Sequence, residues 1–347
     1  MALSVPILIW GAGAIGGSLG AGFIRAGHDV VFVDNVTAHV DAINRDGLRV
    51  VGPVFEDVVK VPAFLPEDLT GKFDRIFLCV KALHTAAATQ ALIPFLAESG
   101  VVISAQNGLN EKTIAAALGA DKTIGCFVNF SADYLEPGKV TYSGRGAVVI
   151  GELDGAKTDR ITALHQLMCD FDPKAVLTPN IWGYLWGKLT YGTLLFATAL
   201  TNDSIVDVLG NPAVRDVLIR LGRETGAVAA SEQVTPEAFD GFDPLAFAPG
   251  AAQSALDKSF DDMVAHNRLS TKSHSGIWRD LAIRKRKTEA EAQLGPIIEA
   301  GRRNSLPTPL TERLIAMVLE IETGKRPLAD ENLKELARFG QNMEAPG

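Results

Sequence analysis

The first residues that could do chemistry form a glycine-rich motif, GAGAIG, at residues 11–16. The motif follows an apolar run at residues 5–10 and opens a helical pattern, which is the strand, turn and helix context of dinucleotide-binding sequences. Its first glycine would allow a tight turn, its second would let a pyrophosphate approach the backbone, and its third would let the helix pack on the strand. The alternative is an ordinary glycine turn. We expect a dinucleotide to contact Gly11, Gly13, Ala14, Ile15 and Gly16.

A carboxylate follows at the end of the second apolar run, at residues 29–34. Asp34 lies eighteen residues after Gly16, where an acidic side chain can accept hydrogen bonds from the adenosine ribose of NAD. The same carboxylate would repel the 2′-phosphate of NADP, and no arginine occurs between it and Arg45. Alternatively, Asp34 starts a turn or caps a helix that begins near Thr37, and the two roles are compatible.

The composition limits the class of protein. The chain has 347 residues, of which 47% are hydrophobic and 21% charged, so we expect two folded domains rather than disorder or a small disulfide scaffold. A net charge of −8 would repel a polyanion, so we expect no nucleic-acid partner. The start of the chain lacks the basic segment of a signal peptide, and its apolar runs are too short to cross a bilayer. We therefore expect a cytoplasmic protein with no membrane contact.

Cysteines and histidines give no sign of a disulfide framework or a metal site. Cys79, Cys126 and Cys169 are odd in number and widely spaced, which favours reduced thiols. The six histidines show no H-x-x-x-H spacing. We expect no bound metal.

The first half of the chain alternates strand-like and helix-like patterns, which is typical of a parallel sheet with crossover helices. The predicted strands are residues 5–10, 29–34, 75–80 and 101–105, and the predicted helices are residues 16–26 and 85–97. Further strand-like runs at residues 123–130, 138–143 and 147–151 suggest added, partly antiparallel strands.

The pattern changes near Pro179, where we place a domain boundary. Beyond it helical spacing predominates. We expect helices at residues 181–200, 214–232, 251–265, 288–304 and 309–323, a loop at residues 235–250 and a frayed tail at residues 342–347. The predicted organisation is an α/β dinucleotide-binding domain at residues 1–179 and an all-α domain at residues 180–347.

Several motifs in the same order resemble those of the ketopantoate reductase (2-dehydropantoate 2-reductase) family over nearly the whole chain. They are GAGAIGG at residues 11–17, VKA at 80–82, QNG at 106–108, WGKL at 186–189, Thr288-Glu289 and, more loosely, residues 301–309. The resemblance implies a Rossmann-type N-terminal domain, an all-α C-terminal domain for substrate binding and dimerisation, and a site in the cleft between them. We accordingly expect a homo-oligomer, in the form of a dimer.

The resemblance implies that Lys188 is the catalytic lysine. Hydride delivered to a ketone carbon leaves negative charge on the oxygen, and a cation within hydrogen-bond reach stabilises that charge and then gives up a proton. The alternative is a solvated helix lysine, although its neighbours Trp186 and Leu189 are apolar.

Glu289 and Ser275 match the substrate-binding residues of the family; we also count Lys188 with the substrate-binding residues and Glu289 with the catalytic ones. Glu289 would accept a hydrogen bond from a substrate hydroxyl, and Ser275 would donate one to the substrate carboxylate. Alternatively, Glu289 only starts a helix, where the macrodipole favours acidic residues. The segment at residues 280–289 is one residue longer than usual, which leaves the register of Ser275 open.

Two more residues follow predicted strands, at the carboxyl ends where open α/β sheets bind ligands. Asn107 resembles the asparagine that the family places near the nicotinamide, and we count it with both the catalytic and the cofactor-binding residues. Lys81 is a second candidate cofactor contact. The alternatives are turn chemistry at Asn107-Gly108 and a plain surface lysine.

The chain departs from the family on the helix of Lys188. The family usually has asparagines four and eight residues after the lysine, and this chain has Gly192 and Phe196. We expect a more apolar pocket and poor activity on ketopantoate. The basic run at residues 284–287 is either a solvated stretch or a means of drawing an anionic substrate.

Together these features predict a nicotinamide-dependent oxidoreductase that interconverts a small 2-oxo acid and its 2-hydroxy acid, with NAD preferred over NADP. One alternative is an NAD-dependent dehydrogenase of a sugar acid or branched hydroxy acid in catabolism. Another is a non-catalytic, dinucleotide-sensing protein, against which the retained Lys188 argues.

Overall fold

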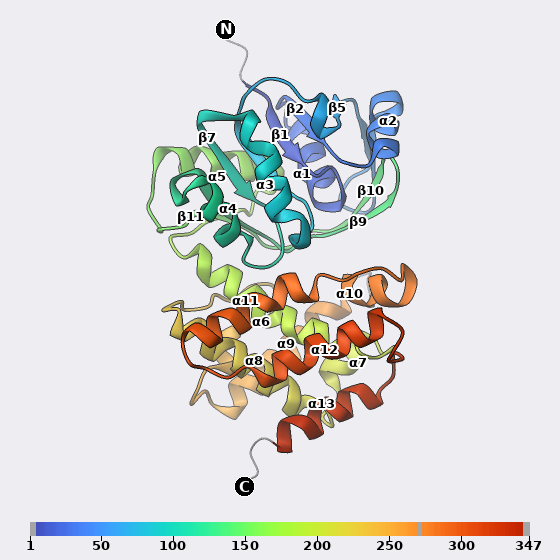
Figure 1. Ribbon diagram of the computed structural model, residues 1–347, viewed down its shortest axis with the longest axis vertical. Helices are drawn as coiled ribbons and strands as arrows, with labels where there is room; N and C mark the ends of the chain where they lie inside the picture. Colours follow the sequence, from blue (N-terminus) through green and yellow to red (C-terminus); the bar gives the residue numbers. More distant parts are fainter. Residues whose placement is uncertain (1–4, 270–272, 343–347) are drawn as a thin grey trace. The chain divides into compact units, whose positions relative to one another are not determined.

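The structure is a computed structural model that describes residues 5–269 and 273–342. The chain divides into two compact units between Ile181 and Trp182. We call them the N-terminal unit and the helical unit (Figure 1). The N-terminal unit is α/β and the second is all-α, which confirms the predicted fold class.

The N-terminal unit is built on an eight-stranded sheet with the order β12-β11-β8-β7-β6-β1-β2-β5. The strands are β1 (Ile7–Trp10), β2 (Val30–Val33), β5 (Ala63–Phe64), β6 (Phe73–Leu78), β7 (Leu96–Ser104), β8 (Thr123–Val128), β11 (Val148–Glu152) and β12 (Val176–Leu177). Neighbouring strands are parallel except β8 and β11, which are antiparallel. The prediction of added, partly antiparallel strands is therefore right for β11.

Helices cover both faces of this sheet. They are α1 (Ala14–Arg25), α2 (Thr37–Asp46), α3 (Thr85–Leu92), α4 (Asn110–Leu118) and α5 (Asp159–Phe171). Ile7 and Ile9 of β1 enter a core with α1 and α5, whereas Leu8 and Trp10 enter one with α3 and α4. Since successive side chains of a strand point to opposite faces, the two helix pairs lie on opposite sides. Burial on both faces explains why these strands read as continuous apolar runs.

A second sheet has the order β4-β3-β10-β9. Its strands are β3 (Leu48–Val51), β4 (Asp57–Val59), β9 (Ser131–Glu136) and β10 (Lys139–Gly144). The predicted strand at residues 138–143 is β10, but it pairs here with β3 and β9 instead of extending the main sheet. This strand is indeed partly antiparallel, since it pairs antiparallel with β9. Its pairing with β3, some ninety residues earlier, cannot be predicted from local spacing.

The predicted helix at residues 85–97 is too long. Helix α3 ends at Leu92, a 3-10 turn spans Ile93–Phe95, and β7 starts at Leu96. Pro94 explains the difference, because proline lacks the N–H that an α-helix interior needs.

The helical unit contains most of the helices that the sequence predicts. Its elements are α6 (Ile181–Thr198), α7 (Ile205–Gly210), α8 (Arg215–Ser231), α9 (Gln253–Arg268), α10 (Gly276–Trp278), a π-helical turn (Arg279–Ile283), α11 (Ala290–Arg303), α12 (Pro309–Glu322) and α13 (Glu331–Asn342). Helix α13 was not predicted. Glu335 of α13 is ion-paired with Arg326 at 2.8 Å, and only Asn342 of the expected tail lies within the described residues.

The segment at residues 235–250 is irregular, as predicted, but it is packed rather than loose. A 3-10 turn spans Pro244–Phe247, and Phe239 and Phe242 form an isolated β-bridge. The ring of Phe242 lies 5.2 Å from that of Tyr191 on α6. This aromatic contact fixes the segment against α6.

Across the described residues we find no helix whose length and hydropathy would let it cross a lipid bilayer.

Candidate active site

The glycine-rich turn connects β1 to α1, as the motif predicts. Gly11 has φ +101°, and a Cβ there would lie 3.0 Å from the backbone nitrogen of Val80. A Cβ at Gly16 would lie 2.0 Å from the Gly11 carbonyl oxygen and 2.8 Å from Ile9 Cγ2. Both positions therefore require glycine, the first for its conformation and the second for close packing of helix on strand.

The N-terminus of α1 is suited to an anion. Gly13 is the N-cap residue and no described side chain caps the helix, while Ala14 and Ile15 are half-exposed. The first N–H groups of a helix lack intrahelical acceptors, and the helix dipole favours negative charge there. No described atom lies within 4 Å of the position that a Cβ would take at Gly13. These residues fit the pyrophosphate of a dinucleotide.

Asp34 forms the turn that the sequence suggested and also contacts the glycine-rich turn. Its Oδ2 accepts a hydrogen bond from the Ala12 N–H at 2.9 Å, which places the carboxylate against the glycine-rich turn. Its Oδ1 accepts one from the Val36 N–H at 3.0 Å, which forms the turn before α2. The side chain stays partly exposed. Two backbone N–H groups hold the Asp34 carboxylate in place, and its geometry suits the acceptance of a hydrogen bond from a ribose hydroxyl.

Lys81 and Asn107 follow the carboxyl ends of β6 and β7, the same sheet edge from which the glycine-rich turn leaves β1. Lys81 is half-exposed and precedes a 3-10 turn at Ala82–His84. Asn107 is exposed and is followed by Gly108 with φ +100°. The structure thus brings these two residues to the edge that holds the dinucleotide motif, and Asn107-Gly108 is also a turn.

A buried network of polar side chains joins the loop that follows β6 to the loop that follows β7. The Gln106 amide donates to the Val80 carbonyl and to the Thr85 hydroxyl, both at 2.8 Å. The Thr85 hydroxyl donates to Asn110 Oδ1 at 2.9 Å, and the Asn110 amide donates to the Asn107 carbonyl at 2.7 Å. A satisfied network of this kind rigidifies the segments that it connects. Gln106 stood out in the sequence only as part of the QNG motif, and its role in this network was not predicted.

Glu111, next to this network on α4, is fully buried. Neither carboxyl oxygen has a hydrogen-bond partner of normal geometry among the described residues. Burial raises its pKa to about 8, against smaller opposing effects of its own backbone N–H and of the Ser104 hydroxyl. The carboxyl is therefore protonated near neutral pH.

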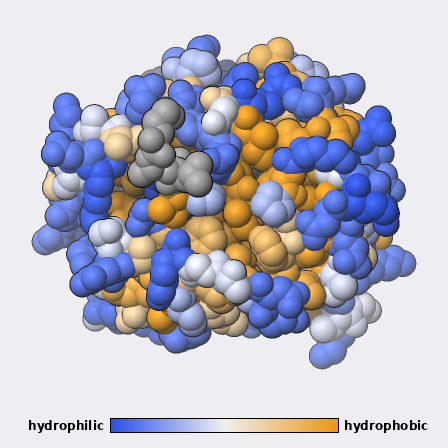
Figure 2. Space-filling view, turned by 90° about the horizontal axis from the view of Figure 1, so that it is seen from above, coloured by the Kyte–Doolittle hydropathy of each residue, from blue (hydrophilic) through white to orange (hydrophobic). Residues whose placement is uncertain are grey.

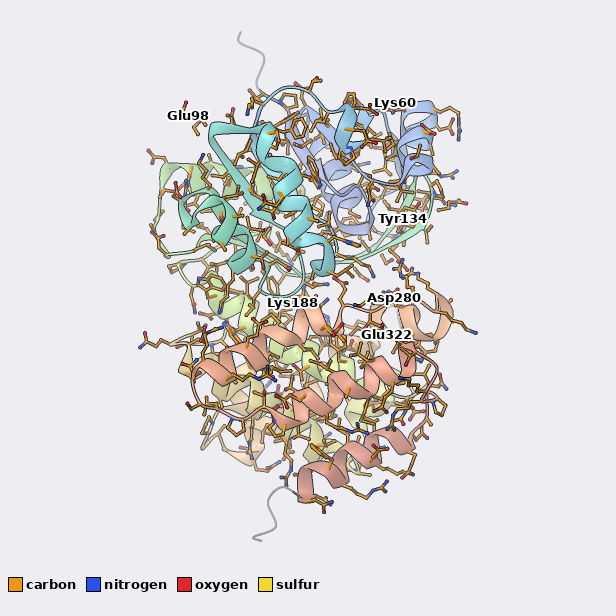
Figure 3. The ribbon with its side chains drawn as sticks, viewed as in Figure 1. Lys60, Glu98, Tyr134, Lys188, Asp280 and Glu322 are labelled. Atoms are coloured by element: carbon orange, nitrogen blue, oxygen red, sulfur yellow. The ribbon has the colours of Figure 1, made fainter. Side chains whose placement is uncertain are left out.

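Lys188 lies on α6 in the helical unit and is half-exposed, whereas Leu189 and Trp186 are buried (Figure 3). Another face of α6 is covered by the segment at residues 235–250, in which the Glu237 N–H donates to the Gly183 carbonyl at 2.9 Å. The helix is thereby fixed with the Lys188 side partly open.

The two departures from the family on α6 behave differently. Apart from its chain neighbours and the backbone of α6, no described atom lies within 4 Å of the position that a Cβ would take at Gly192, so the space beside Lys188 is open one turn further on. Phe196 is fully buried. The expectation that its ring would make the pocket more apolar was wrong, because the ring belongs to the core.

Ser275 and Glu289 both occupy helix N-cap positions. Ser275 Oγ accepts the Trp278 N–H at 3.2 Å, which leaves the hydroxyl hydrogen for another acceptor. Before α11 the Thr288 hydroxyl accepts the Ala290 N–H at 3.3 Å and donates to Glu322 at 2.6 Å. The Glu289 side chain makes no hydrogen bond that caps α11, but the residue does stand at the start of this helix, as the macrodipole alternative expects.

Three of the four basic residues at 284–287 are ion-paired with neighbours, which supply two carboxylates for the four positive charges. Arg284 and Arg286 pair with the buried Asp280 at 3.1 and 2.9 Å, and Lys287 pairs with Glu291 at 3.2 Å. This local pairing weakens the interpretation of the run as an attractor of anionic substrates.

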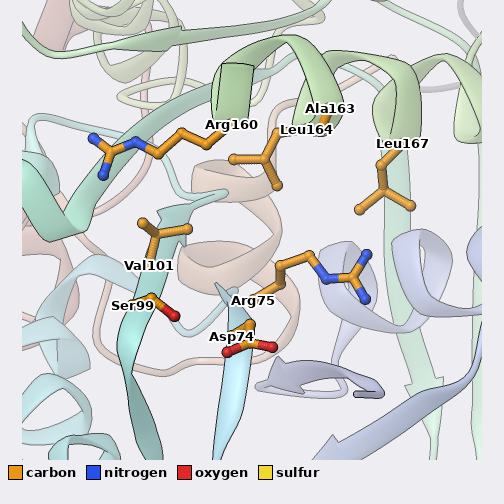
Figure 4. Close-up of a pocket in the computed structure, with 8 residues that line it drawn as sticks. All are labelled: Asp74, Arg75, Ser99, Val101, Arg160, Ala163, Leu164 and Leu167. Carbon is orange, nitrogen blue, oxygen red and sulfur yellow. The ribbon is translucent and has the colours of Figure 1, made fainter. Parts of the chain in front are cut away.

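A cavity of about 210 Å³ lies elsewhere in the N-terminal unit (Figure 4). Asp74 and Arg75, which line it, stand at the amino end of β6, opposite the edge of the glycine-rich turn. Another lining residue, Arg160, is already paired with Glu152 at 2.6 Å.

The face of the molecule in Figure 2 combines a polar rim with an apolar area. Within the described residues, no three His, Cys, Asp or Glu side chains gather to hold a metal.

Comparisons with known proteins agree with this fold. Two family models, described as ketopantoate reductase PanE/ApbA and its C-terminal part, match residues 7–155 and 180–322. The 2-dehydropantoate 2-reductase of Archaeoglobus fulgidus is 27% identical over 330 residues, which cover 92% of this chain and 98% of that protein.

Solved structures give the same result. A PanE/ApbA family ketopantoate reductase from Ralstonia eutropha superposes with a TM-score of 0.78 at 27% identity, covering 92% of this chain and 99% of the other. A D-mandelate dehydrogenase with bound NADH and anilino(oxo)acetate has a TM-score of 0.79 at 20% identity, with the same coverage, and shares the fold. The chain therefore belongs to the ketopantoate reductase family of NAD(P)-dependent oxidoreductases.

Proposed function

We propose that this protein reduces a small 2-oxo acid to its 2-hydroxy acid with NADH as the preferred cofactor. Residues 1–179 would bind the cofactor, and residues 180–347 would bind the substrate and form a homodimer in the cytoplasm. The observation that carries the proposal is the Lys188 side of α6, where a half-exposed ammonium adjoins open space at Gly192 on an otherwise mostly buried helix.

Lys188 would be the general acid. The bound nicotinamide supplies a hydride to the carbonyl carbon of the substrate. The Lys188 ammonium stabilises the negative charge that develops on the carbonyl oxygen and donates the proton that completes the hydroxyl group. In the reverse direction the neutral amine accepts that proton.

Ser275 and Glu289 would orient the substrate. The Ser275 hydroxyl keeps its hydrogen available because the Trp278 N–H occupies only its oxygen, so it can donate to a substrate carboxylate. The Glu289 carboxylate makes no hydrogen bond that caps α11, and it would accept one from a substrate hydroxyl.

Asn107 and Lys81 would contact the cofactor from the edge of the sheet. The Asn107 amide can donate and accept at once, which suits a carboxamide group. The network through Gln106 and Asn110 supports this role because it holds the Asn107 backbone in place.

The preference for NADH rests on Asp34. Two backbone N–H groups hold its carboxylate beside the glycine-rich turn. A ribose 2′-hydroxyl can donate to this acceptor, whereas a 2′-phosphate within about 4 Å would be repelled by about 1 kcal/mol or more.

A second candidate is the dehydrogenation of a larger 2-hydroxy acid, such as a branched or aromatic one. Gly192 favours it, because the side chain that the family usually has there is absent and its place is open. The D-mandelate dehydrogenase of the same fold binds NADH and anilino(oxo)acetate, which carries an aromatic ring.

A thermal-shift screen tests both candidates. The protein with NADH is melted in the presence of a panel of 2-oxo and 2-hydroxy acids of increasing size. A ligand that binds only the folded state raises Tm in proportion to RT ln(1 + [L]/Kd). We expect one class of 2-oxo acid to raise Tm and then to be reduced. A failure of NADH and NADPH to raise Tm would contradict the proposal.

A further inference from the structure

A buried histidine that the reaction does not use lies against the glycine-rich turn. His39, in the first turn of α2, is 1% exposed. Its Nε2 lies 2.9 Å from the Ala12 carbonyl oxygen, and its Nδ1 lies 2.8 Å from the Gly138 nitrogen. Gly138 belongs to the turn between β9 and β10, ninety-nine positions away in the sequence.

These contacts determine which nitrogen carries the hydrogen. The Gly138 N–H can only donate, so Nδ1 is the acceptor and is unprotonated. Nε2 then carries the hydrogen and donates it to the Ala12 carbonyl. His39 is thus the neutral Nε2–H tautomer, assigned from its hydrogen-bond partners.

The Ala12 backbone is therefore held from both sides. Its N–H donates to Asp34 and its carbonyl accepts from His39. In a trans peptide the next N–H, that of Gly13, points opposite to the carbonyl. His39 consequently fixes the direction of a backbone donor in the motif that receives the pyrophosphate.

The β9–β10 hairpin is attached to the same turn. The Tyr134 ring of β9 makes an edge contact with His39 at 5.1 Å between centroids. Helix α1 packs closely on this sheet, because a Cβ at Gly17 would lie 3.3 Å from Val140 Cγ1 of β10. Burial and the nearby Asp34 raise the pKa of Tyr134, which places its phenol within electrostatic reach of the ribose-binding carboxylate.

We propose that the β9–β10 hairpin forms a wall of the adenosine end of the dinucleotide site, and that His39 is the positioning residue that ties this wall to the glycine-rich turn. The proposal rests on the proposed use of a nicotinamide dinucleotide. Tyr134, half-exposed on the hairpin, is the side chain that would face the adenosine (Figure 3).

Binding of the two halves of the cofactor separates this role from general stability. We would measure ADP, nicotinamide mononucleotide and NADH by calorimetry with wild-type protein, His39→Leu and His39→Gln. The Leu variant should bind ADP and NADH about tenfold more weakly, as expected for a lost hydrogen bond between buried groups, with nicotinamide mononucleotide unchanged. The Gln variant, which keeps a donor and an acceptor, should recover part of the loss.

His165→Leu is the matched control. His165 on α5 also contacts a backbone carbonyl, that of Ala175 at 2.9 Å, but it lies outside the glycine-rich turn. ADP affinity should be unchanged in this variant. Equal losses in His39→Leu and His165→Leu would overturn the proposal, because they would show a general effect of destabilisation.

A measurement on the wild-type protein covers the case in which His39→Leu does not fold. Side-chain ¹⁵N spectra of the histidines should show His39 as the Nε2–H tautomer, and ADP should shift its ring signals but not those of His165. Unshifted His39 signals at saturating ADP would overturn this inference alone. If the wild-type protein bound neither ADP nor NADH, the proposed function would fall with it.

Discussion

The two units offer different kinds of groups for the proposed reaction. In the N-terminal unit the candidate site is mainly backbone, held by Asp34, His39 and the Gln106 network. In the helical unit it consists of single side chains, Lys188, Ser275 and Glu289, on one helix face and at two helix starts. A backbone site suits the constant part of a cofactor, whereas one substitution can change the specificity of a site made of side chains, and we propose that Gly192 is such a substitution.

The largest effect should come from the helical unit. Replacing Lys188 with Ala should lower kcat by about two orders of magnitude or more, because the general acid is lost, while the Kd for NADH stays the same. Stopped-flow and steady-state kinetics on the best substrate measure both values. Lys334→Ala, on the exposed side of α13, is the control. Retention of most of the activity in Lys188→Ala would refute the assignment.

The N-terminal unit should set the choice of cofactor. We expect kcat/KM to favour NADH over NADPH by at least about tenfold, or about 1.4 kcal/mol. Asp34→Ala should shrink that ratio by weakening NADH binding and relieving the repulsion of the 2′-phosphate. The exposed Asp41→Ala is the control, and all variants are compared at one pH and salt concentration. A wild-type preference for NADPH would mean that Asp34 serves only the turn before α2.

Filling the space at Gly192 should change the substrate preference and leave the affinity for the cofactor unchanged. Gly192→Leu should lower kcat/KM for a bulky 2-oxo acid relative to pyruvate by roughly tenfold, the scale of one or two methylene groups in a pocket. Gly226→Leu is matched, since Gly226 also lies within a helix with no described atom within 4 Å of its Cβ position. An unchanged ratio in Gly192→Leu would place the substrate elsewhere.

The last effect concerns stability instead of activity and arises from the buried Glu111. Its pKa is about 8 in the folded protein against 4.5 for an ordinary glutamate. Below pH 4.5 both states hold the proton, and between the two values only the folded state does. The free energy of unfolding therefore falls as pH rises through this window, by at most about 1.4 kcal/mol per pH unit.

Denaturant unfolding of the wild type and Glu111→Gln at several pH values measures this slope. The Gln variant should lose it. Glu335→Gln is a useful contrast, because Arg326 and Arg313 lower the pKa of Glu335 to about 2, so its contribution is lost only as pH falls below about 4.5. Equal slopes for the wild type and Glu111→Gln would contradict the account.

Local patterns predicted the parts of the fold that depend on neighbours in the sequence. The glycine-rich turn needs only its adjacent strand and helix, and α6 needs only a long apolar helical pattern. Parts that depend on distant partners were not predicted. His39 acquires its role from Gly138, and β3 and β9 acquire theirs from β10.

The substrate site shows the same limit. The family resemblance selected Lys188, Ser275 and Glu289, but only packing shows that Gly192 adjoins open space while Phe196 belongs to the core. Spacing along a helix places a residue on a face, whereas the packing of other segments decides whether that face is covered. The role of the basic run could not be predicted either, because its pairing with Asp280, which binds two of its arginines, appears only in the folded chain.

Whether the protein is a working 2-oxo acid reductase can be measured directly. NADH oxidation by the wild-type protein is followed with ketopantoate and a panel of larger 2-oxo acids. We expect turnover of at least one panel member with kcat/KM above about 10⁴ M⁻¹s⁻¹, and a lower value for ketopantoate. Tight NADH binding with no turnover of any 2-oxo acid would contradict it and would identify a dinucleotide-sensing protein instead.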